Sequence, residues 1–137
     1  MHISTKTEYA VRGLAEIGKH QQEGPISIVE ICNRQKLPKK YTEQLFRKLR
    51  SAELISSVQG AKGGYILAKE ANEITLNDIM HAVEENISQV NCDENYQSRE
   101  YCIGLPCGFY ELWNEIDEHL DAYFNSITLK HIIEKLN

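Results

Sequence analysis

Hydrophobic residues between positions 27 and 67 recur first at helical spacing and then in two short runs, which predicts two helices followed by a β-hairpin. The first helix should begin at Ile28, because Ser27 and Glu30 form a capping-box pattern. Its apolar positions are Ile28, Ile31 and Cys32, and those of the second helix, after a break at Lys36 to Pro38, are Tyr41, Leu45, Phe46, Leu49 and Ala52. Two short helices with this interruption predict a helix-turn-helix.

A glycine-rich turn follows the two helices. Residues Ile55–Val58 and Tyr65–Leu67 flank the turn Gly60-Ala61-Lys62-Gly63-Gly64, whose glycines allow positive φ and a close approach of backbone to another surface. A helix-turn-helix with such a hairpin, or wing, is suited to holding duplex DNA. The pattern therefore predicts a mainly α fold, a winged helix-turn-helix with a small β-hairpin wing.

Further helices are predicted on both sides of this element. A helix capped by Ser4 or Thr5 should run to about His20 and pack beneath the DNA-binding helices. A second capping-box-like pattern, at Thr75 to Asp78, should start a helix that ends near Asn86.

A long helix is predicted beyond Cys107, and Thr128 should cap a short helix after it. The apolar stripe of the long helix comprises Leu112, Trp113, Ile116, Leu120, Tyr123, Phe124 and Ile127. This stripe exceeds what a small domain covers easily, so we expect a homodimer that pairs these long C-terminal dimerisation helices and places two recognition helices on successive major-groove faces. The alternative is a helix that folds back on its own domain.

Basic charge is concentrated in the predicted helix-turn-helix. The whole chain is acidic, with 15 basic and 20 acidic residues, but residues 34–62 carry eight basic residues against Glu43 and Glu53, or eight minus two, a net charge of plus six. From Glu70 onward 14 acidic residues face three basic ones, or three minus fourteen, a net charge of minus eleven. The local field, rather than the total charge, indicates a nucleic-acid partner.

A chain of 137 residues is long enough for one compact domain, and a hydrophobic content of 42% excludes a wholly disordered protein. We divide it into a DNA-binding region (1–85), a cysteine-bearing sensor loop (86–107) and a dimerisation region (108–137). No CxxC motif, Ser-His-Asp pattern or phosphate-binding glycine loop indicates an enzyme. Because no apolar run suits a signal peptide or a membrane span, we expect a cytoplasmic protein without a membrane partner.

Three cysteines, Cys92, Cys102 and Cys107, lie in or at the end of a polar stretch with weak periodicity. Nine residues separate the first two and four the second pair, which is not a CxxC zinc pattern. In a cytosolic protein such a group binds a metal or senses redox state more often than it forms a structural disulfide. Zinc that stabilises the protein is one alternative. The fourth cysteine, Cys32, stands where a helix-turn-helix packs a small apolar residue, and we assign it to the core.

The chain resembles the IscR, NsrR and CymR group of winged-helix transcription regulators, several of which carry an iron–sulfur cluster. The resemblance covers nearly the whole chain and rests on STKTEYAVR at 4–12, KYTEQL at 40–45, VQGAKGGY at 58–65 and ITLNDI at 74–79. It implies that Lys40, Tyr41, Glu43 and Gln44 enter the major groove and that the wing reaches the minor groove. The family commonly has Arg before the first wing glycine, where this chain has Gln59, for which Lys62 would partly substitute.

Side-chain chemistry suggests separate roles within this surface. Gln44 suits a bidentate contact with adenine, and Glu43 suits a cytosine amino group, although pairing of Glu43 with Arg47 along the helix is an equal alternative. Lys39, Lys40, Arg47 and Lys62 suit phosphates. The predicted DNA-binding residues are Lys39, Lys40, Tyr41, Glu43, Gln44, Arg47, Gln59, Lys62 and Gly63.

The resemblance also implies that Cys92, Cys102 and Cys107 ligate a [2Fe-2S] or [4Fe-4S] cluster, since thiolates are the natural ligands of such iron. IscR-like proteins keep these cysteines closer and add a nearby His, where this chain has Tyr110, so the fourth ligand is open. NsrR-like relatives use an acidic residue from the partner subunit, which corresponds to Glu8; the alternative is an exposed first-turn Glu favoured by the helix dipole. His81 and His119 are weaker choices.

The sequence thus predicts a dimeric, sequence-specific DNA-binding transcription regulator that senses iron, redox state or nitric oxide through an iron–sulfur cluster. The rival within the same class is a cluster-free regulator that uses thiol chemistry or a protein partner as its signal. Loss or oxidation of a cluster would release the cysteine loop, shift the dimer helices and change the distance between the recognition helices.

Overall fold

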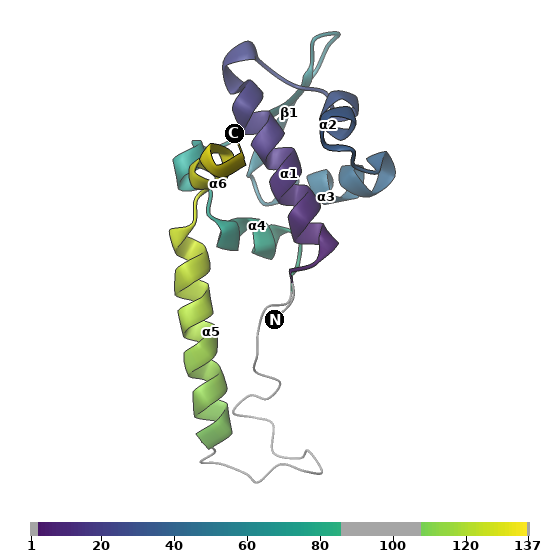
Figure 1. Ribbon diagram of the computed structural model, residues 1–137. Helices are drawn as coiled ribbons and strands as arrows, with labels where there is room; N and C mark the ends of the chain where they lie inside the picture. Colours follow the sequence, from purple (N-terminus) through teal and green to yellow (C-terminus); the bar gives the residue numbers. More distant parts are fainter. Residues whose placement is uncertain (1–2, 86–107, 137) are drawn as a thin grey trace.

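The computed structural model describes residues 3–85 and 108–136, and in this part the fold is mainly helical with one two-stranded sheet (Figure 1). The elements in chain order are α1 (Thr5–His20), η1 (Gln21–Glu23), α2 (Ile28–Gln35), α3 (Lys39–Ser51), β1 (Ile55–Val58), β2 (Gly64–Leu67), η2 (Ala71–Glu73), α4 (Leu76–Ala82), α5 (Gly108–Ser126) and α6 (Leu129–Leu136). The predicted winged helix-turn-helix is confirmed.

The helix-turn-helix begins and turns where the pattern indicated. The Ser27 hydroxyl accepts a hydrogen bond from the Glu30 backbone N–H at 3.2 Å, so α2 starts at Ile28. The other half of the predicted capping box is wrong, because the Glu30 carboxylate pairs with Arg34 one turn further along instead of returning to the cap. Lys36 ends α2 in the left-handed region at φ 55°, and Pro38 precedes α3.

α3 ends one residue earlier than its apolar pattern suggested. Ala52 is an exposed C-cap residue, not part of the buried face, and the chain then turns through Glu53 at φ 61°. The backbone N–H of Leu54 bonds the Leu49 carbonyl, which satisfies a carbonyl at the helix end. This tight exit places β1 directly against the end of α3.

The hairpin pairs β1 with β2 in an antiparallel register that joins Ile55 to Leu67 and Val58 to Gly64. β2 also pairs on its other side with the segment before α2, because Ile26 and Tyr65 exchange both backbone hydrogen bonds at 3.2 and 2.8 Å. A Cβ on Gly64 would lie 2.3 Å from the Ile26 carbonyl oxygen, so only glycine permits this approach. The wing is thereby attached to the entrance of α2.

α1 forms the centre of the hydrophobic core and packs against α2, α3 and α6, as expected for a helix beneath the DNA-binding pair. A Cβ on Gly13 of α1 would lie 2.6 Å from the ring of Phe46 on α3, and this absence of a side chain lets the two helices approach closely. The buried core comprises Ala10, Leu14, Ile17, Ile26, Ile31, Leu45, Phe46, Leu49, Leu54, Ile55, Leu67, Ile74, Ile79, Val83 and Leu129.

α4 has the complete capping box that was predicted, formed reciprocally by Thr75 and Asp78. It ends at Ala82 rather than near Asn86, because Glu84 takes a left-handed conformation at φ 60° that terminates the helix. α6 begins at Leu129, directly after Thr128. The Thr128 hydroxyl accepts a hydrogen bond from the His131 backbone N–H at 3.2 Å, so the predicted cap at Thr128 is confirmed.

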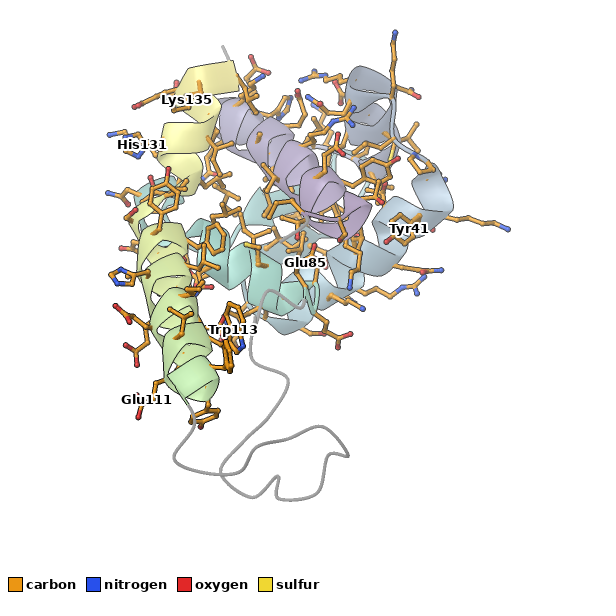
Figure 2. The ribbon with its side chains drawn as sticks, turned by 60° about the horizontal axis from the view of Figure 1, so that its bottom comes forward. Tyr41, Glu85, Glu111, Trp113, His131 and Lys135 are labelled. Carbon is orange, nitrogen blue, oxygen red and sulfur yellow. The ribbon has the colours of Figure 1, made fainter. Side chains whose placement is uncertain are left out.

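α5 projects from the body and packs against α4 only along part of its length (Figure 1). Phe124 near its C-terminal end is buried, whereas Phe109, Leu112, Trp113 and Tyr123 are exposed, Phe109 and Tyr123 by more than 60%. Figure 2 shows Trp113 and Glu111 on opposite sides of this helix. The predicted long C-terminal helix is confirmed, and part of its apolar stripe has no cover within the described residues.

Candidate DNA-binding surface

The solvent-facing side of α3 carries Lys40, Gln44 and Arg47, which are all exposed and recur at helical spacing. Lys40 and Arg47 form no ion pair within residues 3–85 and 108–136, so their charges are available to an anionic surface. A row of two cations with an amide between them combines phosphate attraction with a group capable of reading a base edge.

Glu43 and Lys39 lie beside this row. The Glu43 carboxylate is 4.0 Å from the Lys39 ammonium, one turn toward the helix start, whereas the sequence alternative paired it with Arg47. At this distance in solvent the pair contributes little stability, so either side chain can turn to another partner.

Tyr41 is half-buried and contacts Tyr9 of α1 edge-to-face, with ring centroids 6.0 Å apart. Arg12 lies over the face of Tyr9, with its guanidinium carbon 5.7 Å from the ring centroid. Tyr41 therefore joins the first turn of α3 to α1 through part of its ring. Of the predicted major-groove residues, Lys40 and Gln44 are exposed, Glu43 is partly exposed, and Tyr41 also packs against the core.

The wing tip presents Gln59 and Lys62 as exposed side chains. Gly60 has φ 112°, and a Cβ on Gly63 would lie 2.1 Å from the Val58 carbonyl oxygen, so the turn closes only because both positions are glycine. The Gly63 backbone N–H bonds the Gly60 carbonyl at 3.0 Å. The tip is a small, bonded turn with Lys62 as its one cation.

Hydrogen bonds join α1 to the helix-turn-helix at Gln35, a residue that the sequence analysis did not identify. Gln35 is the last residue of α2, and its amide donates to Glu16 at 2.6 Å while Arg12 donates to both its side-chain and backbone oxygens. Glu16 is buried and also lies 3.5 Å from Arg34. The only sequence signal for this contact was the one-turn spacing of Arg12 and Glu16 on α1.

The proposed cluster ligands are placed only in part. Cys92, Cys102 and Cys107, with the loop 86–107, lie outside the described residues. Glu8 is on the first turns of α1 with its side chain 58% exposed, and its carboxylate pairs with Arg12 at 3.4 Å. In the described part of the chain no three His, Cys, Asp or Glu side chains are grouped to hold a metal ion.

The remaining candidate side chains have plainer environments. His81 and His119 are exposed on helix surfaces. Cys32 is buried, as assigned from the sequence, and burial raises the pKa of its thiol even though a hydrogen bond with Thr42 opposes the shift. Cys32 therefore behaves as a small core residue.

Known proteins share this fold and much of this sequence. The IscR transcriptional regulator of Pectobacterium atrosepticum is 37% identical over 134 residues, which are 97% of this chain and 79% of that protein. Among solved structures, CymR of B. subtilis superposes with a TM-score of 0.80 at 33% identity over 98% of both chains. The structure of T. potens IscR gives a TM-score of 0.77 at 31% identity, covering all of this chain and 89% of that one.

None of the helices in the described part of the chain has the length and apolar character to cross a membrane. The relatives are transcription regulators, a role without catalysis, and this chain shares that role. Residues 3–135 match the Rrf2 family, described as iron-dependent transcriptional regulators. The chain therefore belongs to the Rrf2 family of winged-helix, DNA-binding transcription regulators.

Proposed function

We propose that this regulator is a homodimer that recognises a specific DNA sequence and responds to iron, redox state or nitric oxide through an iron–sulfur cluster. The observation that carries the DNA part is the row Lys40, Gln44 and Arg47 on α3, where both cations lack ion pairs within the described residues. In this proposal the N-terminal half of α3 enters the major groove and the wing tip approaches the minor groove.

The DNA contacts divide by chemistry. Gln44 reads adenine, and Glu43 accepts from a cytosine amino group once it leaves Lys39. Lys39, Lys40, Arg47 and Lys62 hold phosphates, while Gln59 and Gly63 bring the wing backbone close to the duplex. Lys40→Ala should therefore weaken binding on all sequences, whereas Gln44→Ala should relax preference at one base position. Equal losses on selected and random duplexes for both variants would contradict this division.

The dimer is supported by α5. Its exposed side chains Phe109, Leu112 and Tyr123 form an apolar face with no cover in the described part of the chain, and water-exposed surface of this kind is costly on a lone subunit. A two-fold pairing of α5 buries this face against itself and sets a fixed separation between two copies of α3. In this scheme residues 1–85 bind DNA, 86–107 sense and 108–137 dimerise, in the cytoplasm.

The donor set fits an iron–sulfur cluster. Cys92, Cys102 and Cys107 would supply three thiolates. The Glu8 carboxylate is exposed and, among residues 3–85 and 108–136, pairs only with Arg12, so it is free to reach a neighbouring subunit. When bound, the cluster supplies a group whose charge and ligation change with oxidation, nitric oxide or loss of iron. Within this chain, Arg12 contacts both Glu8 and Gln35, so a change at Glu8 alters the grip of α1 on the helix-turn-helix.

The test is the visible spectrum of protein purified without oxygen, with iron and acid-labile sulfide assays. Brown protein with matched iron and sulfide, lost in Cys102→Ser, is the expected result. Glu8→Ala, with Glu23→Ala as a control in the exposed η1 segment, should change cluster lifetime without changing the fold. Stoichiometric zinc without visible absorption would contradict the cluster and leave a zinc-stabilised regulator.

A second candidate is a cluster-free regulator that uses its thiols or a protein partner as the signal. The observation in its favour is the superposition on CymR, the global cysteine regulator of B. subtilis, which covers 98% of both chains. Colourless, iron-free protein despite a good iron supply would select this candidate over the cluster.

A further inference from the structure

A groove lies between the end of α3 and the root of the hairpin, apart from the residues assigned to base contacts. It encloses about 480 Å³ and is open to solvent along one side. Its polar lining comprises Arg50 near the end of α3, Glu53 in the turn after it, Ser56 and Ser57 on β1, and Lys69 after β2. Two cations and two hydroxyls therefore face one concavity.

Neither cation has a close carboxylate partner in the described part of the chain. Arg50 and Lys69 are exposed, and neither forms an ion pair in residues 3–85 or 108–136, whereas nearby Lys48 is paired with Glu84 at 3.0 Å. A guanidinium offers a planar pair of N–H donors and an ammonium offers a point charge, both suited to a phosphodiester. The carbonyls at the end of α3 are bonded by the backbone N–H groups of Ala52, Glu53 and Leu54, which reduces their repulsion of an anion.

The groove lies between α3 and the hairpin, the two elements that the proposed function places against DNA. If α3 occupies the major groove and the wing tip the adjacent minor groove, the sugar–phosphate strand that separates the two grooves crosses the space between α3 and β1. Arg50 lies on the same side of α3 as Lys39 and Glu43. Because Arg50 lines the groove together with residues of β1, the C-terminal end of this side of α3 faces β1. An open groove suits a strand that continues past it.

We propose that this groove is a phosphate-binding site, in which Arg50 and Lys69 hold the DNA strand between the two grooves and Ser57 donates its hydroxyl. The proposal rests on the proposed DNA contacts of α3 and the wing. Glu53 lines the same groove with the opposite charge, so it weakens the site. Removing the charges of Arg50 and Lys69 should therefore lower DNA affinity, and removing the charge of Glu53 should raise it.

The test compares binding to a duplex of about three helical turns, selected from a random pool by the unmodified protein, over a range of salt concentrations. Arg50→Ala/Lys69→Ala should reduce the slope of log affinity against log salt by about two, because two phosphate contacts are lost. Glu53→Gln should raise affinity. Lys130→Ala, which removes an exposed cation on α6, is the matched control and should leave the slope unchanged. An unchanged slope in the double variant, or weaker binding by Glu53→Gln, would overturn the site.

Two further arms separate the outcomes. A neutral methylphosphonate placed at the strand between the grooves should weaken binding of the unmodified protein but not of the double variant; equal weakening of both overturns the contact. Inorganic phosphate without DNA should not shift the Ser57 amide resonance at millimolar concentration, and saturation would make this a free-anion site and overturn the DNA assignment. If both Lys40→Ala and the double variant bind DNA as tightly as the unmodified protein, the proposed DNA contacts of α3 are wrong. If only the double variant binds unchanged, the phosphate site in the groove is wrong and the contacts of α3 stand.

Discussion

Gln35 at the end of α2 donates its side-chain amide to the buried carboxylate of Glu16 on α1, with a nitrogen–oxygen distance of 2.6 Å. Arg12 donates to the side-chain oxygen and the backbone oxygen of Gln35. Two successive turns of α1 therefore bind Gln35, the residue directly before the turn of the helix-turn-helix. The turn that leads into α3 is therefore held by α1, in addition to the packing of α3 itself.

Replacing Gln35 with Leu removes a donor from buried Glu16 and an acceptor from Arg12. We expect a loss of about 1–3 kcal/mol in the free energy of unfolding, measured by urea denaturation, because buried polar groups lose their partner. Gln22→Leu, on the exposed η1 segment, should change it by less than about 0.5 kcal/mol. Equal effects of the two substitutions would show that the contact does not stabilise the fold.

The Gly13→Ala substitution sets two effects against each other. Alanine favours a helix interior by about 0.5–1 kcal/mol over glycine, but its Cβ would lie 2.6 Å from the ring of Phe46. Phe46 is fully buried and packs edge-to-face on Tyr65 at 5.0 Å, so the ring has no space to retreat. Overpacking of about 1–3 kcal/mol should win, and thermal denaturation should show a net loss of stability. A more stable Gly13→Ala protein would mean that α1 and α3 separate easily.

Substitution of Leu112 by Asp places a charge in the apolar face of α5 that we propose as the dimer interface. Sedimentation equilibrium should show a dimer for the unmodified protein. The variant should dissociate with a dissociation constant at least about tenfold higher, or about 1.4 kcal/mol. The control is Glu118→Ala, an exposed substitution on another side of the helix. A Leu112→Asp protein that remains dimeric would exclude this face as the interface.

Glu85 gives the fold a dependence on pH. Burial opposes its ionisation, but hydrogen bonds from the Ser4 hydroxyl, Thr7 and the Ser4 backbone, with the charge of Lys6, outweigh burial and lower the pKa of the carboxyl. A lowered folded pKa means that the ionised group stabilises the fold above the unfolded value of about 4.3 and that this contribution is lost as pH falls through the folded pKa.

The corresponding experiment is denaturation of the unmodified protein and Glu85→Gln across acid pH. The unmodified protein should lose stability more steeply below about pH 4.3 than the variant does, and the two curves should run parallel near neutrality. Glu134→Gln, on the exposed surface of α6, serves as a control. Identical acid limbs for Glu85→Gln and the unmodified protein would show that the Ser4 and Thr7 contacts carry no linkage.

Local signals in the sequence were sufficient for most of the fold. The caps at Ser27, Thr75 and Thr128 and the glycines of the wing each act within a few residues, so the pattern alone located the starts of α2, α4 and α6 and the hairpin. The end of α4 was missed because it depends on a left-handed Glu84, a conformation that Glu seldom adopts and that no local motif announces.

The site was predicted less completely, for the same physical reason. Exposed side chains such as Lys40 and Gln44 follow from helical spacing, which the sequence contains. The contact of Gln35 with Glu16 and the groove between Arg50 and Lys69 join residues 19 apart in each case, across different elements. Such pairs depend on how helices and strands pack, which spacing along one element cannot supply.

The two backbone hydrogen bonds between Ile26 and Tyr65 divide the wing into strands that are held in place and a tip whose side chains can change. Because the inner strand of the wing is bonded to the entrance of α2 on one side and to β1 on the other, its course is held from both edges. The five residues from Gln59 to Gly63 lie beyond these bonds to Ile26 and carry no part of the core. Divergence of operator preference among descendants of this chain could therefore proceed by replacing side chains at the tip, while the strands that support it stay unchanged.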